Sequence, residues 1–348
     1  MKFNFFIILI IVFLFKTENI LSNDGIFNVN NIEIDLKKFK KNKNYIDSAF
    51  KKGFEDLTTR ILLEKDHVKV SDTNIEIIKD LISHYQISDK LDGKKDEIIK
   101  INIFFDKKKI NNFFLKNDIS YSDFTKRSII LFPLLINNEN FFIYDDNYFY
   151  TAWNNLSTKE NNLIEYILPI ENLENFKKVK NNYNNIENIK ILDLVSDYEN
   201  DNYSLVIVNE FPKYANVLIK CLILDQSVTR NFTIKQNDFK KDDFYNQIIL
   251  KARKQILEII KSQNTVDLQT PSFLNLKLRM DKRDDLLKLQ SILEKIDLID
   301  KFSVVQFNKN EVKIKIKYYG KIKSISEKLK KNGINIIISD NQWDIKLT

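Results

Sequence analysis

The stretch Val312-Lys-Ile-Lys-Ile-Lys-Tyr318 decides the fold of the last part of the chain. Apolar and basic residues alternate along it, which is typical of a strand with one buried face. A second strand, Phe302 to Phe307, precedes it across the turn Asn308-Lys309-Asn310. The two strands therefore predict a hairpin, and the neighbouring elements can be placed around it.

The elements on either side of this hairpin complete a recognisable order. A strand and a leucine-rich helix precede it, and a helix and two short strands follow it. Asn332-Gly333 ends the second helix in the manner of a glycine cap. The order β-α-β-β-α-β is the ferredoxin-like split motif, a scaffold that hosts many unrelated functions. The predicted ranges are a strand over 273–280, a helix over 283–296, a helix over 322–329 and terminal strands over 334–338 and 343–347.

Upstream, a second unit is predicted over residues 127–263. The continuous apolar run from Ile129 to Ile136 is expected of a strand buried on both faces. An amphipathic helix over 245–260 closes the unit, and Asp146 or Asn147 could cap a short helix that contains Phe149. Further strands are predicted over 141–144, 163–169, 189–195, 203–208 and 217–224.

The first unit is predicted over residues 23–126. Helical spacing of apolar residues covers 44–63 and a second stretch from Ile75 to Ile82, for which Ser71, Asp72 or Thr73 would serve as the cap. A strand follows over 97–105. The sequence thus predicts an α+β or α/β protein of three small mixed units, over 23–126, 127–263 and 270–348.

Residues 1–22 have the layout of a secretory signal. Met1-Lys2 is followed by an apolar run from Phe5 to Phe15 and then by polar residues from Lys16 to Asn19. The run is shorter than the roughly 20 residues that a spanning helix needs. A cleaved signal is favoured, with an uncleaved amino-terminal anchor or a buried core segment as alternatives. After cleavage no stable membrane span is expected.

The single cysteine, Cys221, excludes an internal disulfide framework. An exported protein without disulfides fits the bacterial periplasm better than a eukaryotic secretory route. The net charge of +7 arises from lysines that are spread along the chain and interleaved with acids. This spread predicts a solvated surface, with no nucleic-acid partner, although a lysine-based face for an anionic polymer or lipid stays open as an alternative.

Catalytic and ligand motifs do not stand out. His67 and His84 are too few for a histidine and cysteine metal site, and Cys221 lies within an apolar stretch. The five glycines form no loop that could cradle a phosphate. The sequence therefore predicts no catalytic residue, no metal and no cofactor. Acid pairs that could suggest acid–base chemistry lie at predicted turns or helix starts, at Asp145-Asp146, Asp242-Asp243 and Asp284-Asp285.

An aromatic cluster in the second unit is the candidate partner-binding surface. Alternation of sides would leave some of its rings outside, and exposed aromatic residues often mark a partner site. The alternative is core packing between a strand and the following helix. The candidate residues are Phe142, Tyr144, Tyr148, Tyr150 and Trp153.

Five stretches of the sequence carry a family resemblance: 46–54 with 57–62, 103–114 with 119–121 and 127–132, 167–175, 203–208, and Tyr319-Gly320 with Leu329, Gly333 and Trp343. The chain is similar to the exported proteobacterial domain-of-unknown-function family numbered two-thousand-and-sixty-six, and its second unit distantly resembles the amino-terminal domain of the periplasmic Tol–Pal translocation protein. The resemblance implies location and architecture, and no catalytic residues.

The sequence favours a non-enzymatic periplasmic accessory or binding protein of the cell envelope, whose partner is an envelope protein. The alternatives are a hydrolase of an envelope polymer with a carboxylate site, and a lysine-based binder of anionic polymer or lipid. The sequence favours no particular oligomeric state.

Overall fold

A computed structural model describes residues 25–38, 45–88, 98–123, 126–156, 163–200, 202–237, 239–280, 282, 284–308, 310–339 and 342–347. The predicted signal over residues 1–22 lies outside them. The chain divides into two compact units, Met1–Leu57 with Asp72–Phe113, and Thr58–Ser71 with Phe114–Thr348. The predicted α+β class is confirmed, because helices and several separate sheets alternate along the chain.

The first unit contains a three-stranded antiparallel sheet in the order β1-β3-β2. The central strand alternates half-buried and buried residues, as a strand with one covered face should. Helix α2 packs closely on the sheet at Gly53, where a Cβ atom would lie 2.7 Å from Cδ1 of Ile103 and 2.8 Å from Cδ1 of Ile32. The elements are β1 (Asn28–Asp35), η1 (Leu36–Lys38), α2 (Tyr45–Ile61), α4 (Ile75–Leu81), β2 (Ile82–Ser88), β3 (Ile98–Phe105) and α5 (Lys107–Lys116). The ends of two of these helices, α2 from Thr58 and α5 from Phe114, belong to the second unit.

A six-stranded mixed sheet is the largest in the second unit. Its order is β10-β9-β8-β5-β6, and β7 pairs with the start of β5. Strand β5 is the predicted doubly buried run and lies parallel to both β7 and β8. The strands are β5 (Arg127–Asn137), β6 (Asn140–Phe142), β7 (Ile164–Ile167), β8 (Asn202–Phe211), β9 (Tyr214–Ile223) and β10 (Gln226–Lys235).

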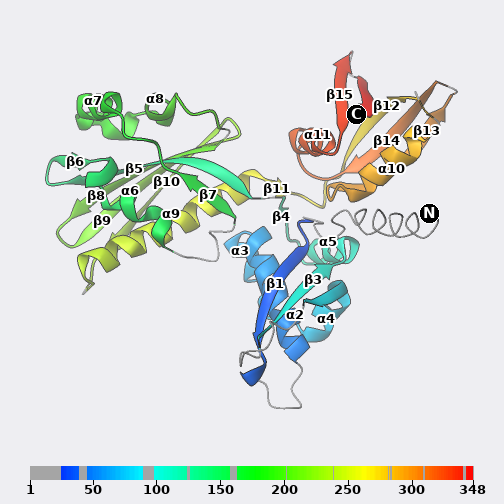
Figure 1. Cartoon of the computed structure of the whole chain (residues 1–348), viewed down its shortest axis with the longest axis horizontal. Coiled ribbons are helices and arrows are strands. Elements are labelled where there is room, and N and C mark those ends of the chain that lie inside the picture. Colours follow the sequence, from blue (N-terminus) through cyan, green and yellow to red (C-terminus); the bar gives the residue numbers. More distant parts are fainter. Residues whose placement is uncertain are drawn as a thin grey trace, which may run out of the picture. The chain divides into compact units, whose positions relative to one another are not determined.

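Hydrophobic cores lie on both faces of this sheet, and Figure 1 shows helices on both of its sides. One core packs α9 and α6 against the sheet, and the other packs α7, η5 and α8 against the opposite face. Because both faces are covered over the middle of β5 and β8, each strand has a continuous apolar run there, 129–136 in β5 and 205–208 in β8. The covering elements are η2 (Tyr144–Asp146), α6 (Tyr148–Ala152), η3 (Trp153–Asn155), α7 (Leu173–Asn181), η5 (Tyr183–Asn188), α8 (Ile191–Val195) and α9 (Lys241–Gln263).

Three local predictions were wrong. Residues 191–195 form helix α8 instead of a strand, because their apolar residues cover one face of the sheet and do not pair with it. Helix α4 is capped by Asn74, whose side chain accepts from the N–H of Glu76, and not by the three residues proposed. Ile82 begins strand β2 instead of ending the helix.

The carboxy-terminal sheet has the order β13-β14-β12-β16-β15. Its first three strands have the arrangement of the predicted split motif, with β14 antiparallel between β12 and β13. It differs at the terminal hairpin, since β16 enters beside β12 in parallel and leaves β15 at the edge. The elements are β12 (Ser272–Arg279), α10 (Asp285–Lys295), β13 (Ile299–Phe307), β14 (Glu311–Tyr318), α11 (Ile322–Lys331), β15 (Ile334–Ser339) and β16 (Gln342–Leu347).

A two-stranded ladder also belongs to the second unit. It joins β4 (Tyr121–Ser122) to β11 (Thr265–Val266), two segments far apart in the sequence. Short helix α3 (Glu64–His67) lies in this unit as well. Among the described residues, no helix is both long enough and apolar enough to cross a bilayer.

Candidate functional site

The predicted aromatic cluster does not form one exposed surface. Tyr144 is 4% exposed and Trp153 is fully buried, so neither ring is available to a partner. Phe142, Tyr148 and Tyr150 are half-buried. Tyr148 donates to the side chain of Asn246 at 3.0 Å, and Tyr150 donates to the carbonyl of Pro169 at 2.8 Å.

The cores also separate these rings. Phe142, Tyr148 and Trp153 pack in the core that contains α9, whereas Tyr144 and Tyr150 pack in the core on the opposite face of the sheet. Core packing thus accounts for Tyr144 and Trp153. A partner role for Phe142, Tyr148 and Tyr150 stays a prediction.

Arg253, a buried cation on α9, serves as a cap. Its guanidinium donates to the carbonyl oxygens of Leu156, at 2.9 Å, and Trp153. The same group lies against the rings of Trp153 and Tyr166, 6.0 and 5.4 Å from their centroids. Arg253 therefore satisfies carbonyl groups at the end of η3, a role that sequence reasoning missed because these groups are about a hundred residues away.

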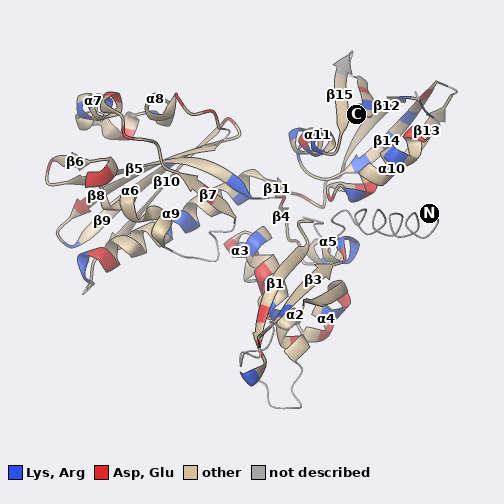
Figure 2. Ribbon diagram, viewed as in Figure 1, with Lys and Arg blue, Asp and Glu red and all other residues tan. Residues whose placement is uncertain are grey.

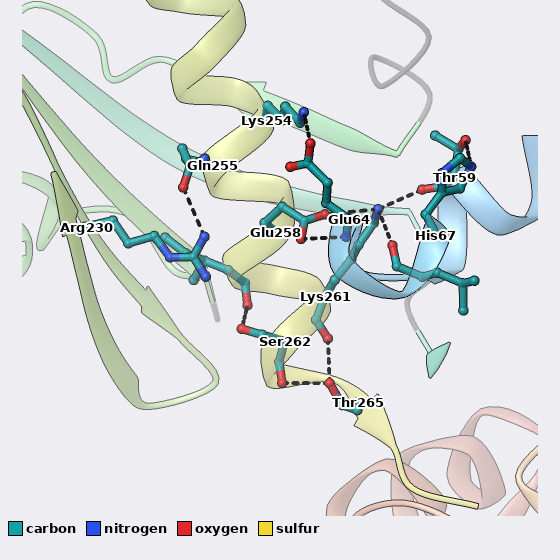
Figure 3. A network of polar contacts seen from close by, with 12 residues as sticks. Thr59, Glu64, His67, Arg230, Lys254, Gln255, Glu258, Lys261, Ser262 and Thr265 are labelled. Carbon is teal, nitrogen blue, oxygen red and sulfur yellow. Dashed lines mark hydrogen bonds and ion pairs between the residues drawn. The ribbon is translucent and has the colours of Figure 1, made fainter. Parts of the chain in front are cut away.

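Lys261, the second buried cation on α9, has a similar role within the second unit (Figure 3). Its ammonium donates to the carbonyls of Thr59 at 2.7 Å and Leu62 at 2.9 Å, and pairs with Glu258 at 3.4 Å. These contacts satisfy the three donors of the group and cap the carboxyl end of α2. Arg253 and Lys261 thus both bind backbone carbonyl groups of the fold, and their polar contacts are structural.

Glu64 extends the network along α9. Its backbone N–H donates to Glu258 at 3.1 Å, and its carboxylate pairs with Lys254 at 2.7 Å. Lys254, Glu258 and Lys261 follow the i, i+4, i+7 spacing that places residues on one helix face. The sequence shows this spacing, but it does not show which residues the three side chains contact.

The other chemistry-bearing residues are dispersed. Cys221 is 1% exposed, and burial raises the pKa of its thiol to about 11. His67 lies 3.2 Å from the hydroxyl of Thr59, and the ring of exposed His84 stacks on Phe104. The acid pairs occupy η2 and the starts of α9 and α10, as predicted for residues that favour a helix amino terminus.

A groove of about 360 Å³ opens on the larger sheet. Cross-strand pairing places Asn209, Asn216 and Thr233 in one row across β8, β9 and β10, and Thr233 donates to Asn216 at 2.8 Å. Ile207, Leu218 and Asn231 form the adjacent row. The groove therefore offers amide and hydroxyl groups above an apolar floor, with no charged side chain from the strands.

The strongest candidate site is the open face of the carboxy-terminal sheet. On β14 the residues Val312, Ile314, Ile316 and Tyr318 are buried, so the alternate residues point to the opposite face. Those alternate residues are Lys313, Lys315 and Lys317. Figure 2 shows basic residues along β14 and β12.

Residues paired directly across a ladder share a face, so the register extends this surface. Lys313 lies opposite Lys277 on β12, and Lys317 lies opposite Phe273 on β12 and Lys301 on β13. We call this surface the lysine face. Its basic members are Lys277, Arg279, Lys301, Lys313, Lys315, Lys317 and Lys346, and its neutral members are Phe273, Asn275, Ser303, Gln306, Asn335 and Ile337.

Acidic residues neutralise only part of the lysine face. Glu311 pairs with Lys277 at 3.1 Å, and Asp300 pairs with Lys317 at 2.8 Å. The hydrogen bond that each ammonium donates to its carboxylate partner raises the pKa of the lysine. Asp344, which lies opposite Lys277, adds a third negative charge.

Several ammonium groups remain available to a ligand. Lys301, Lys313, Lys315 and Lys346 are exposed, and none forms an ion pair with another described residue. The Lys315 ammonium lies 4.6 Å from the ring centroid of Phe273, which is 56% exposed. Along β14 the lysines repeat about every 6.8 Å. The arrangement is a row of cations suited to an anion with repeated charges.

Comparisons with known proteins do not indicate a function for this chain. No family model and no curated protein matches the sequence. Among solved structures, the lipoprotein GNA1162 from Neisseria meningitidis is 14% identical with a TM-score of 0.23, over 37% of this chain and 96% of that chain. An uncharacterised protein is 11% identical with a TM-score of 0.17, over 40% and 93% of the two chains. Protein XCC0632 from Xanthomonas campestris, family DUF330, is 8% identical with a TM-score of 0.14, over 41% and 82%. Similarities this low carry no argument about function.

Proposed function

We propose that this protein is a non-enzymatic binding protein of the bacterial cell envelope, and that its lysine face binds a linear anionic polymer. The observation that carries the proposal is the row of Lys313, Lys315 and Lys317 on one exposed side of β14. No helix of the described residues covers this face, and a sheet face with more basic than acidic side chains attracts polyanions. A lysine-based binder of an anionic polymer or lipid was one of the alternatives that the sequence left open, and we infer that the lysine face is its binding surface.

The neighbouring side chains favour a polymer over a lipid surface. Asn275, Ser303 and Gln306 lie between the lysines, and their amides and hydroxyl can hydrogen-bond to a bound chain. Binding to a membrane interface depends instead on apolar side chains that enter the acyl layer beside the basic ones. On the lysine face two exposed side chains have that character, Phe273, whose ring lies under Lys315, and Ile337 at the β15 edge. They are outnumbered by the polar and basic side chains around them.

The proposed location in the cell envelope is inferred from the amino-terminal sequence. The signal-like layout of residues 1–22 supports export, and the resemblance to an exported proteobacterial family supports the same location. An envelope polymer with repeated phosphate or carboxylate groups is the class of ligand that fits both the location and the charge.

The test measures binding of the purified protein to long-chain inorganic polyphosphate as a defined linear polyanion. We expect binding whose logarithmic affinity falls linearly with the logarithm of salt concentration. The double variant Lys313→Glu/Lys315→Glu should bind at least tenfold more weakly. Its salt dependence should also be less steep, because two cations that displace counterions have been removed.

The matched control places the same charge change elsewhere in the same sheet-and-helix unit. Lys288→Glu/Lys295→Glu alters two exposed lysines of α10 and should keep the affinity within a few-fold of the unmodified protein. Equal loss in both double variants would show that only net charge matters and would contradict the assignment. Binding to phosphatidylglycerol vesicles but not to polyphosphate would replace the polymer with a lipid surface.

A further inference from the structure

Strand β10 ends the six-stranded sheet and has a free side. Within the described chain it pairs only with β9, over ten consecutive residues from Gln226 to Lys235. The pairing has no register shift, and the strand contains neither proline nor glycine. Such a long, regular edge is a template for pairing with another strand, and most proteins interrupt or shield it.

The direction of its backbone groups follows from two observations. The β9–β10 turn has two residues, Leu224 and Asp225, with φ of 48° and 66°, as a type I′ hairpin requires. At the far end, the N–H of Gln236 donates to the carbonyl of Lys213. Even-numbered residues therefore bond to β9, and the odd-numbered residues 227–235 direct their N–H and C=O groups outward.

The side chains of β10 also differ between its two faces. Ser227, Thr229, Asn231 and Thr233 are exposed on one face and carry hydroxyl or amide groups. Val228, Phe232 and Ile234 are half-buried on the face that packs against the α9 core. The strand is thus polar on one side and mostly apolar on the other.

Two copies of β10 are self-complementary when they run antiparallel about Asn231. In this register Thr229 faces Thr233 of the second copy, and Val228 faces Ile234. Arg230 faces Phe232, which allows a cation–π contact. Each of the odd-numbered residues from Ser227 to Lys235 would exchange both backbone hydrogen bonds with the second copy. Polar residues therefore face polar residues on one side of the strand, and Val228 faces Ile234 on the other.

Neighbouring registers are less favourable. Centring the pair on Arg230 places two arginines directly opposite each other, and like charges at that position are destabilising. Centring it on Thr229 or Thr233 shortens the overlap and leaves outward backbone groups unpaired. The register about Asn231 keeps a long overlap without a charge clash.

We propose that the protein forms a homodimer in which β10 pairs with β10 of a second copy, antiparallel and centred on Asn231. The two sheets become one continuous sheet through a two-fold axis, the commonest symmetry of soluble oligomers. This inference is independent of the proposed function, because the lysine face lies on a different sheet.

Disulfide trapping tests the register directly. Paired residues with outward hydrogen bonds have Cα atoms about 5.5 Å apart, within the range that a disulfide spans. Asn231→Cys should give a crosslinked dimer under mild oxidation. Thr229→Cys should not, because its counterpart in the second copy lies four residues along the strand, roughly 13 Å away. Native Cys221 is buried and should not interfere.

Charged substitutions on β10 test the same pairing in solution, with the oligomeric state measured by analytical ultracentrifugation. Thr229→Lys/Thr233→Lys places lysines opposite each other and should give a monomer, whereas Thr229→Lys/Thr233→Glu should remain dimeric. Equal crosslinking of the two cysteine variants would overturn the register. An unmodified protein that stays monomeric at 100-micromolar concentrations, on the order of the highest practical for this assay, would overturn the dimer.

Discussion

At the scale of the residue, Lys261 shows how a buried charge becomes part of a fold. Its side chain is 4% exposed, and its ammonium makes the contacts with Thr59, Leu62 and Glu258 described above. Replacing it by methionine keeps the length of the side chain but leaves two carbonyls and a nearly buried carboxylate without their cation. Breaking a buried pair in this way costs about 3–5 kcal/mol. We therefore expect Lys261→Met to lower the free energy of unfolding by about 3 kcal/mol in urea titrations.

The same helix provides the control for Lys261. Lys254 pairs with Glu64, and both side chains are more than half exposed. Exposed pairs contribute about 0–1 kcal/mol, so Lys254→Met should have a small effect. A loss at Lys261 no larger than that at Lys254 would mean that the cap does not stabilise the end of α2.

Cys221 gives a second test at this scale. Its thiol is 1% exposed in β9, and burial raises its pKa to about 11. Since the thiolate is the reactive form, the folded protein should not react with Ellman's reagent at pH 8 over an hour or so, whereas the protein in guanidinium should react at once. Rapid reaction of the folded protein would show that β9 opens far more readily than its burial implies.

At the scale of the element, Gly53 determines how closely α2 packs on its sheet. A Cβ atom there would meet the ends of Ile32 and Ile103 at under 3 Å. In Gly53→Leu the gain in helix propensity, about 1 kcal/mol, is opposed by overpacking that costs about 1–3 kcal/mol. Thermal unfolding followed by circular dichroism should show a lower midpoint. Lys51→Leu, on the exposed side of α2, should change the midpoint little, and a similar fall in both variants would contradict the packing argument.

Periodicity predicted the elements whose burial is simple. The run over 129–136 became the doubly covered strand β5, and the alternation over 312–318 became β14. The strand predicted over 189–195 was wrong because a short apolar run fits a buried strand and a helix lying on a sheet equally well. Strand β10 was missed because its face residues are serine, threonine and asparagine, and its sheet position cannot be inferred from its own sequence.

At the scale of the whole molecule, the lysine face shows why the site was harder to predict than the fold. In sequence its lysines alternate with apolar residues or stand beside acids, which suggested a general solvated surface. The strand period sorts them onto one side of β14, and pairing then adds Lys277 and Lys301 from separate strands. The alternation in 312–318 was the one feature of the sequence that indicated a row of lysines on one side of a strand. Which residues lie beside that row on neighbouring strands depends on the topology of the sheet, and a local sequence pattern does not give the topology.

The parallel placement of β16 beside β12 has a consequence for the time course of folding. Leu276 pairs with Trp343, a separation in sequence of 67 residues from 343 − 276, whereas the β13–β14 hairpin closes across a short turn. Distant pairings wait for a larger loop to close and form more slowly. While the terminal hairpin is still undocked, one side of β12 is open to strands of other molecules. The interval between hairpin formation and docking of β16 is therefore a period in which a newly made chain is prone to aggregate through β12.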